Sequence, residues 1–218
     1  MKFVSLAHRT YKKLGNQVMY NLFGYTVARA YVPKFKNPNT DAQQLVRAKF
    51  SLLTEYARQF AAPVALGYKA KAAGEKMYPR NMFIARNYSK VTGSSAAAVN
   101  LDYSQIECAN GPVAQLTLNP SLNTTTPGSI VVSWTDGWLD DPAASNQDKV
   151  FAYVFCADAG IGVLSEGVLR ARTGSVEVSL PSFMSGLEVH VYVFVIGGAQ
   201  STLGESSPTM YAGHAEVG

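Results

Sequence analysis

The side chains best suited to bind a metal ion lie in one acidic loop, which contains Asp136, Asp140 and Asp141 and continues to Asp148. Calcium prefers several carboxylate oxygens from one flexible loop. The spacing does not follow the EF-hand pattern, and carboxylates also gather on ordinary solvated loops. We therefore predict a solvated loop with no bound metal, and we take Asp136, Asp140 and Asp141 as the candidate calcium ligands if a site exists.

The histidines and cysteines show no spacing that supports catalysis or a zinc site. His8, His190 and His214 are far apart in the sequence, and Cys108 and Cys156 are the two cysteines. Structural zinc needs four clustered Cys or His ligands, and thiol catalysis needs a histidine beside the cysteine. Two cysteines are also too few for a disulfide framework, so we expect buried free thiols.

Glycine motifs that hold phosphates or a nucleophile are missing as well. The cluster Gly160, Gly162 and Gly167 has neither the dinucleotide nor the P-loop spacing, and a turn or bulge explains it. The sequence contains no GxSxG elbow and no HExxH motif. We therefore predict a protein that is not an enzyme and that has no cofactor.

Positive charge is concentrated in the first ninety residues. Residues 1–90 hold 16 of the 19 Lys and Arg residues and three acids, a net charge of +13, whereas residues 91–218 hold three bases and 12 acids, a net charge of −9. Bases interleaved with aromatic residues suit nucleic acid through phosphate contacts and stacking. The candidate contacts with nucleic acid or a partner are Lys34, Lys36, Arg47, Lys49, Arg58, Arg80 and Arg86.

The basic part should fold as a β-hairpin followed by helices. Residues 17–23 and 25–32 are rich in β-branched and aromatic residues, with Gly24 between them as the turn. Thr40 and Gln43 form a capping box at the start of a helix. Pro63 should break or restart this helix, and Pro79 suits the first turn of another helix over residues 79–91.

The first helix carries an apolar stripe with helical spacing. Lys49 lies inside the apolar arc, so we expect its stem to pack while its ammonium group reaches water; the alternative is a partner with an acidic group there. The stripe consists of Ala42, Val46, Phe50, Leu53, Ala57 and Phe60.

The acidic part should form an antiparallel β-sandwich. Short segments of strand composition alternate with turns rich in Gly, Pro, Asn and Ser. The expected strands are 98–103, 113–118, 129–135, 149–156, 176–180 and 188–196, with a last one near 209–212. With a joint near Thr92–Ala98, the prediction is an α+β protein with a basic hairpin-and-helix domain, residues 1–95, and an acidic sandwich domain, residues 96–218.

The bulk composition is that of a folded globular protein. The chain has 218 residues, 47% of them apolar and 16% charged. Its longest apolar runs are far below the roughly 20 residues of a membrane helix. His8 and Arg9 interrupt the apolar residues near the start, so we expect no signal peptide, synthesis in the cytoplasm and no insertion into a membrane.

Part of the sandwich pattern resembles a fibronectin type III or immunoglobulin-like domain. Ile130–Trp134 is similar to the fibronectin second strand with its core tryptophan, and 149–156 would be the third strand. Leu180, Gly186 and 189–195 are similar to the approach to the penultimate strand. The tyrosine corner of that family is missing, since Tyr192 lies too far along, so jelly-roll and other sandwiches stay open.

A distinctive Asn-Pro-x-Thr-x-x-Gln-Gln string precedes and opens the first helix. It belongs to a wider pattern of Gly15-Asn16, the hairpin, Lys36-Asn37-Pro38-Asn39-Thr40, Gln43-Gln44, Arg47 and Phe50. In these residues the chain resembles a family of uncharacterised proteins of about this length from Bacteroidota and their phages. The resemblance implies a fold layout and no activity. The Asn-Pro-x-Thr segment before the helix also resembles segments of phage-encoded structural proteins.

Three hypotheses about function follow. The first is a non-enzymatic assembly protein that forms a homo-oligomeric ring, shell or filament from unlike surfaces of neighbouring copies, for example a phage capsid, connector or tail component of the virion. The second is a nucleic-acid-binding module with an acidic partner-binding domain. The third is a carbohydrate or surface adhesion module with Trp138 and Tyr153 as exposed platforms. Packing of the basic part on the acidic part within one molecule is the alternative explanation of the charge pattern.

Overall fold

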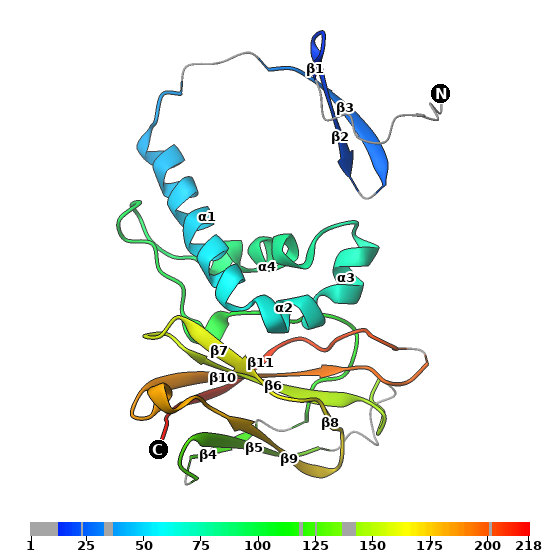
Figure 1. Cartoon of the computed structure of the whole chain (residues 1–218), viewed down its shortest axis with the longest axis vertical. Coiled ribbons are helices and arrows are strands. Elements are labelled where there is room, and N and C mark those ends of the chain that lie inside the picture. The colour runs from blue at the N-terminus through cyan, green and yellow to red at the C-terminus, as the bar shows by residue number, and fades with distance from the viewer. Residues whose placement is uncertain are drawn as a thin grey trace. The chain divides into compact units, whose positions relative to one another are not determined.

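The computed structural model describes residues 13–22, 24–32, 37–117, 120–124, 126–136, 143–200 and 202–218. The chain divides into two compact units, residues 1–40 and residues 41–218. Figure 1 shows the first unit as a small sheet and the second as helices above two layers of strands. We describe each unit by itself.

The first unit contains an antiparallel meander, which we call the arm. The strands β2 and β3 form the expected hairpin, with Gln17 opposite Ala30 and Leu22 opposite Tyr25. Gly24 has a φ of 81°, which a side chain would disfavour, and it closes the turn. The strands are β1 (Lys13–Leu14), β2 (Gln17–Leu22) and β3 (Tyr25–Ala30).

The second unit begins with four α-helices. Pro79 occupies the first turn of α4, where its missing N–H costs nothing. The expected break at Pro63 occurs earlier, at Phe60, and Pro63 lies in the first turn of the next helix. The helices are α1 (Asp41–Gln59), α2 (Ala61–Gly67), α3 (Lys69–Gly74) and α4 (Pro79–Asn87), followed by the 3-10 turns η1 (Tyr88–Lys90) and η2 (Tyr103–Gln105).

Two antiparallel sheets follow in the second unit. One sheet has the order β11-β10-β6-β7, with β8 also paired to β6, and the other has the order β4-β5-β9. The bounds are β4 (Ser121–Asn123), β5 (Ser129–Thr135), β6 (Lys149–Cys156), β7 (Ile161–Leu164), β8 (Val168–Leu169), β9 (Thr173–Ser179), β10 (Glu188–Ile196) and β11 (Met210–Glu216), with the 3-10 turn η4 (Ser182–Met184) before β10.

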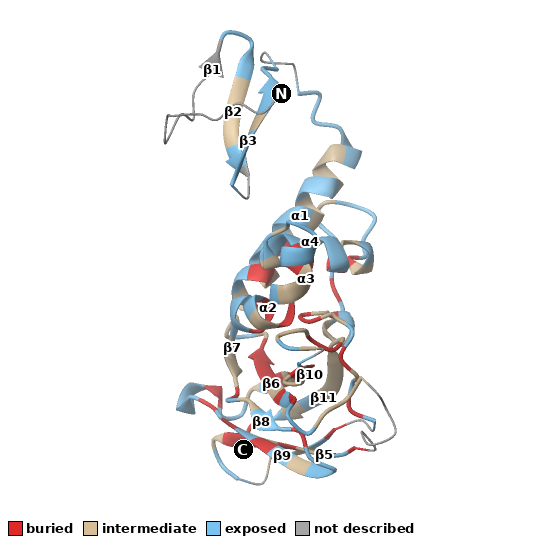
Figure 2. Cartoon of the chain, turned by 90° about the vertical axis from the view of Figure 1, so that its right-hand side faces the viewer, coloured by how far each residue is buried: buried red, intermediate tan, exposed pale blue. Residues whose placement is uncertain are grey.

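The strands β6 and β10 are buried on both faces, because each face belongs to a different core. Val191 and Val193 of β10 point into the core between the two sheets, together with Trp134 of β5. Tyr192 and Phe194, one residue out of phase, belong to a second core shared with the helices. Figure 2 shows β6 in the buried colour. The large sheet is therefore the middle layer of the unit.

The expected α+β class is confirmed: a hairpin, helices and mainly antiparallel strands occur in that order. The expected strands 129–135, 149–156 and 188–196 match β5, β6 and β10. Residues 98–103 were expected to form a strand; they contain an isolated bridge and the start of η2 instead. Residues 113–117 are also irregular, and the segment at 160–167 that was assigned to a turn or bulge contains β7.

The expected boundary after residue 95 falls inside the second unit, which begins at Asp41. Helices α1 to α4 share their core with β6 and β10, so the packing of the basic helices on the acidic sandwich occurs within one molecule. Within the described residues, no helix is long and apolar enough to cross a membrane.

Candidate functional site

The contact between helices and sheet is aromatic, not ionic. Phe60, at the junction of α1 and α2, has its ring centroid 4.8 Å from that of Phe155, 5.0 Å from that of Tyr153 and 5.3 Å from that of Tyr192. Hydrophobic burial of this kind is non-directional and strong, and it needs no charge complementarity. This contact therefore does not depend on the opposite charges of the two parts.

Two tyrosine hydroxyls complete this contact. Tyr153 Oη donates to the carbonyl oxygen of Gln59 at 2.7 Å, and Tyr192 Oη donates to that of Tyr103 at 2.9 Å. Burial raises the pKa of both phenols, so they stay neutral donors. Tyr153 is completely buried, which removes it as an exposed platform for a carbohydrate, and Trp138 lies outside the described residues.

Among the described residues, one ion pair joins a base of residues 1–90 to an acid of residues 91–218. Lys90 Nζ lies 2.6 Å from Glu107 Oε1 and also donates to the carbonyl oxygen of Gln105. Asn87, buried on α4, fixes the same segment: its Nδ2 donates to Glu107 O and its Oδ1 accepts from Glu107 N, both at 2.9 Å. These contacts hold residues 105–107 against the helices.

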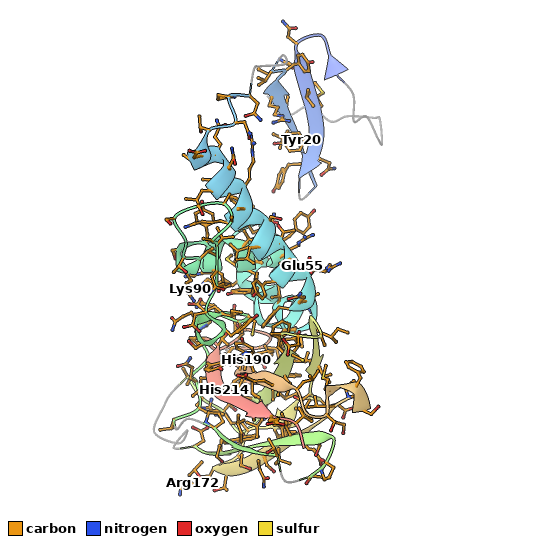
Figure 3. The ribbon with its side chains drawn as sticks, turned by 90° about the vertical axis from the view of Figure 1, so that its left-hand side faces the viewer. Tyr20, Glu55, Lys90, Arg172, His190 and His214 are labelled. Carbon is orange, nitrogen blue, oxygen red and sulfur yellow. The ribbon has the colours of Figure 1, made fainter. Side chains whose placement is uncertain are left out.

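Three of the predicted basic contact residues, Arg58, Arg80 and Arg86, make hydrogen bonds within the second unit. Arg58 pairs with Glu55 one turn away on α1, and Arg80 Nη2 reaches the carbonyl oxygen of Thr54 at 3.5 Å. Arg86 Nη2 instead donates to Asn110 Oδ1 at 3.4 Å. Figure 3 labels Glu55 on α1.

The two remaining α1 candidates differ from each other. Lys49 is partly buried, its Nζ donates to the carbonyl oxygen of Val91 at 2.9 Å, and it lies 5.9 Å from the ring centroid of Tyr88. Its ammonium group thus ends at a backbone acceptor, as a snorkelling lysine can. Arg47 is exposed. Lys34 and Lys36 lie outside the described residues.

Asp136, the described member of the calcium candidates, belongs to a buried ion-pair network. Its Oδ2 lies 2.5 Å from Arg170 Nε, and its Oδ1 accepts from the backbone N and the hydroxyl of Thr117. Arg170 Nη1 is 3.5 Å from Asp148 Oδ2. Both Asp136 oxygens are thus occupied by protein donors. Asp140 and Asp141 lie outside the described residues, and the described part of the chain contains no metal-binding group of three or more His, Cys, Asp or Glu residues.

Two histidines face each other across β10 and β11. His190 is directly opposite His214, and Figure 3 shows both on the same side of the sheet. His190 Nδ1 is 2.9 Å from Tyr211 Oη, and its ring stacks on Tyr103 at 4.3 Å. Burial lowers the pKa of His190 below its usual value. His190 is thus half-buried and has a hydrogen-bond partner, and its ring contact with Tyr103 joins η2 to the sheet.

The cysteines are free and buried, as expected. Burial raises the pKa of the Cys108 thiol to about 12, so it is not a nucleophile at neutral pH. Thr209 Oγ1 accepts hydrogen bonds from the backbone N–H groups of Cys108 and Ala109.

The arm displays a face that the list of basic residues did not capture. Val18, Tyr20, Val27 and Arg29 lie on one face, because Val18 is opposite Arg29 and Tyr20 is opposite Val27. Arg29 Cζ lies 6.0 Å from the ring centroid of Tyr20, a cation–π distance. In the arm, no residue whose burial is described is buried. Figure 3 labels Tyr20 on β2.

A second apolar surface remains exposed on the N-terminal half of α1. The stripe is buried at Leu53 and Ala57, yet Val46 and Phe50 on the same face expose 44% and 48% of their area. Figure 2 shows the change from buried to exposed colours along α1. The periodicity of the apolar residues predicted the stripe, but it could not predict at which residue of α1 the stripe stops being buried.

Comparison with known proteins gives a family and no activity. No curated protein matches the chain. The model of a family described as "Family of unknown function (DUF6266)" matches residues 9–209, which includes the strands of the arm, all four helices and the sandwich as far as the start of β11. The chain therefore belongs to this family of unknown function.

Proposed function

We propose that the protein is a non-enzymatic assembly protein whose copies associate into a homo-oligomeric ring, shell or filament through the arm. The observation that carries this proposal concerns burial: no arm residue whose burial is described is buried, and a sheet of three short strands that buries little apolar area is marginal in water. Contact with a neighbouring copy would supply the missing cover.

Charge indicates which surface the arm meets. Residues 1–40 contain seven Lys or Arg residues and no Asp or Glu, whereas residues 91–218 carry a net charge of −9. Complementary potentials speed encounter and fix the register of a contact. A basic arm on an acidic sandwich is a contact between unlike surfaces, and such heterologous contacts generate rings or filaments. We include the capsid, connector or tail of a phage virion, with a host among the Bacteroidota, as the specific form of this proposal.

The strand order supports an immunoglobulin-like assignment of the sandwich as part of the proposal. The strand with the core tryptophan, β5, is the second of the sandwich, β6 is the third, and β10 is the penultimate strand, as the fibronectin type III resemblance implies. Domains of this architecture are common in proteins that bind other proteins.

The test is the mass of the full chain by size exclusion with light scattering, after nuclease treatment, at ionic strengths of about 50 mM and about 500 mM. The proposal expects a defined oligomer at low salt that becomes smaller at high salt. A strict monomer at low salt and high protein concentration would overturn it.

A second function, nucleic-acid binding, is favoured by one observation: the arm places the exposed Arg29 over the half-buried ring of Tyr20. Cationic and aromatic side chains together bind phosphates and stack on bases. Titration of single- and double-stranded DNA or RNA at low salt decides it. Binding that falls steeply with salt and is lost in Tyr20→Ala supports this function, and no binding at low salt removes it.

A further inference from the structure

We propose that Lys71 of α3 and Arg86 of α4 form a binding site for a phosphate dianion, either inorganic phosphate or the terminal phosphate of an organic ester. Both helices belong to the second unit, and the site includes no residue of the arm. This binding activity goes beyond the proposed assembly and does not rest on it.

The two cations converge on one neutral atom. Lys71 Nζ donates to the side-chain oxygen of Asn110, Oδ1, and Arg86 Nη2 donates to the same oxygen at 3.4 Å. Because both nitrogens lie within hydrogen-bond reach of one atom, they are no more than about 6 Å apart. The carboxamide of Asn110 satisfies their hydrogen bonds but carries no charge. Two like charges therefore meet here without an anion between them.

No carboxylate among the described residues neutralises this pair. Neither Lys71 nor Arg86 forms an ion pair with a described acid. Glu107, the acid in the segment that contains Asn110, is paired with Lys90 at 2.6 Å. Residues 61–90 hold six Lys or Arg residues and one acid. The site therefore keeps an excess of positive charge that a bound anion can neutralise.

The backbone that carries Asn110 is held in place without any ligand. Its N–H donates to the carbonyl oxygen of Gly67 at 3.2 Å. The next residue, Gly111, packs so closely on Ser206 that a Cβ there would overlap the Ser206 carbonyl oxygen. Arg86 is exposed, so an anion can reach its guanidinium group from solvent. The site is thus accessible, and part of it is preorganised.

Charge and donor count indicate the class of ligand. A phosphate with two negative charges matches the two cations, whereas a carboxylate neutralises only one of them. The oxygens of one phosphate can accept from an ammonium and a guanidinium group at the same time. Rotation of the Asn110 carboxamide would present its NH₂ group as a third donor. A phosphate dianion is therefore the ligand that pairs with all three side chains.

Calorimetric titration of the full chain with inorganic phosphate tests the site. At about pH 7.5 phosphate is mainly a dianion, and the ionic strength is kept constant. Lys71→Met and Arg86→Met should each weaken binding at least about tenfold. Lys69→Met is the matched control, because it makes the same charge change at an exposed position of α3 and should leave the affinity unchanged. Absence of binding in the natural protein, or equal weakening in all three variants, overturns the proposal.

A variant that fills the site with its own charge gives an independent test. Asn110→Asp keeps the size of the side chain and places a carboxylate where both cations converge. It should raise the melting temperature and weaken phosphate binding at least about tenfold. An unchanged phosphate affinity in folded Asn110→Asp overturns the proposal, whatever the lysine and arginine variants do to folding.

Two further ligands identify the source of the phosphate. A nucleoside monophosphate that binds more tightly than inorganic phosphate supports a site for an organic ester, and one that binds no more tightly supports a site for phosphate itself. Acetate at the same ionic strength should bind much more weakly, and acetate that binds as tightly as phosphate overturns the assignment to a dianion. Light scattering should give the same mass for Lys71→Met as for the natural protein, so failure of this inference leaves the proposed assembly standing.

Discussion

Arg170 and Asp136 form an ion pair in which the side chains are 1% and 0% exposed, with Nε 2.5 Å from Oδ2. The guanidinium group also donates to the carbonyl oxygens of Ala114 and Gln115. Asp148, on its other side, accepts from the backbone N–H groups of Ser145 and Gly198. Four stretches of chain that are distant in the sequence thus meet at one buried cation. The network holds these segments of the sandwich together where regular strand pairing does not join them.

This network predicts sensitivity to acid. Burial by itself would raise the pKa of Asp136, but the hydrogen bonds from Arg170 and Thr117 outweigh it and hold the pKa below its ordinary value. A carboxylate whose pKa is lower in the folded state than in the unfolded state, where it is about 3.9, stabilises the fold at pH values above the unfolded pKa. This stabilisation is lost as the pH falls through the folded pKa. Asp136→Asn should therefore cost about 3 kcal/mol at neutral pH, and the difference from the natural protein should shrink below about pH 4.

Urea unfolding at a series of pH values between about 2.5 and 7 measures this difference. Asp158→Asn is the control, because Asp158 is an exposed carboxylate in the same sandwich and its replacement should change stability little. A difference between Asp136→Asn and the natural protein that stays constant at all pH values would contradict the linkage.

Phe60 should be the side chain on which the attachment of the helices depends most. Its ring is fully buried and contacts aromatic rings of β6, β10 and α4. Phe60→Ala should lower the free energy of unfolding by about 3–5 kcal/mol, because it leaves a cavity between two layers. Phe183→Ala is the matched control, since Phe183 is 55% exposed. Equal losses in the two variants, measured by urea unfolding, would show that Phe60 does not hold the layers together.

Two helical glycines should respond to alanine in opposite directions. A Cβ on Gly67 would lie 2.7 Å from Cys108 O and closer still to Ala109, so Gly67→Ala forces backbone segments apart and should cost about 1–3 kcal/mol. A Cβ on Gly74 meets nothing within 4 Å, so Gly74→Ala should stabilise by up to about 1 kcal/mol. Thermal unfolding of both variants checks the signs. A stabilising Gly67→Ala would contradict the close packing of α2 on residues 108–109.

Local patterns predicted the elements better than they predicted how the elements are grouped. The strand β9 and the start of α1 were predicted from local patterns. These patterns are the alternation of Val176 and Val178 and the capping box at Thr40. The domain boundary was predicted at the joint near Thr92–Ala98, but the helices before this joint share one hydrophobic core with β6 and β10 after it. Phe60 and Phe155 are 95 positions apart, and no local sequence pattern around either residue predicts that their rings are in contact.

The candidate site shows the same limit. Composition identified a basic N-terminal part but could not distinguish Arg58, which is paired on its own helix, from the exposed Arg29, which lies over the ring of Tyr20. Likewise, Asp136 was grouped with its neighbours in the acidic loop, whereas its partner Arg170 lies 34 positions away. Spacing along the chain does not predict such pairings, because they form only when strands and loops that are distant in the sequence pack together.

Charge reversal at two arginines should change assembly in opposite directions if the arm binds the acidic sandwich of a neighbour. Arg29→Glu removes a positive charge from the arm face and adds a negative one, so the oligomer should dissociate at lower salt than that of the natural protein. Arg172→Glu makes the same change on an exposed position of the sandwich, which becomes more acidic and should hold the basic arm to higher salt. Light scattering across a salt series measures both midpoints. Because the two substitutions are identical in chemistry and in their effect on net charge, a shift in the same direction for both would mean that overall charge, and not the arm, controls assembly.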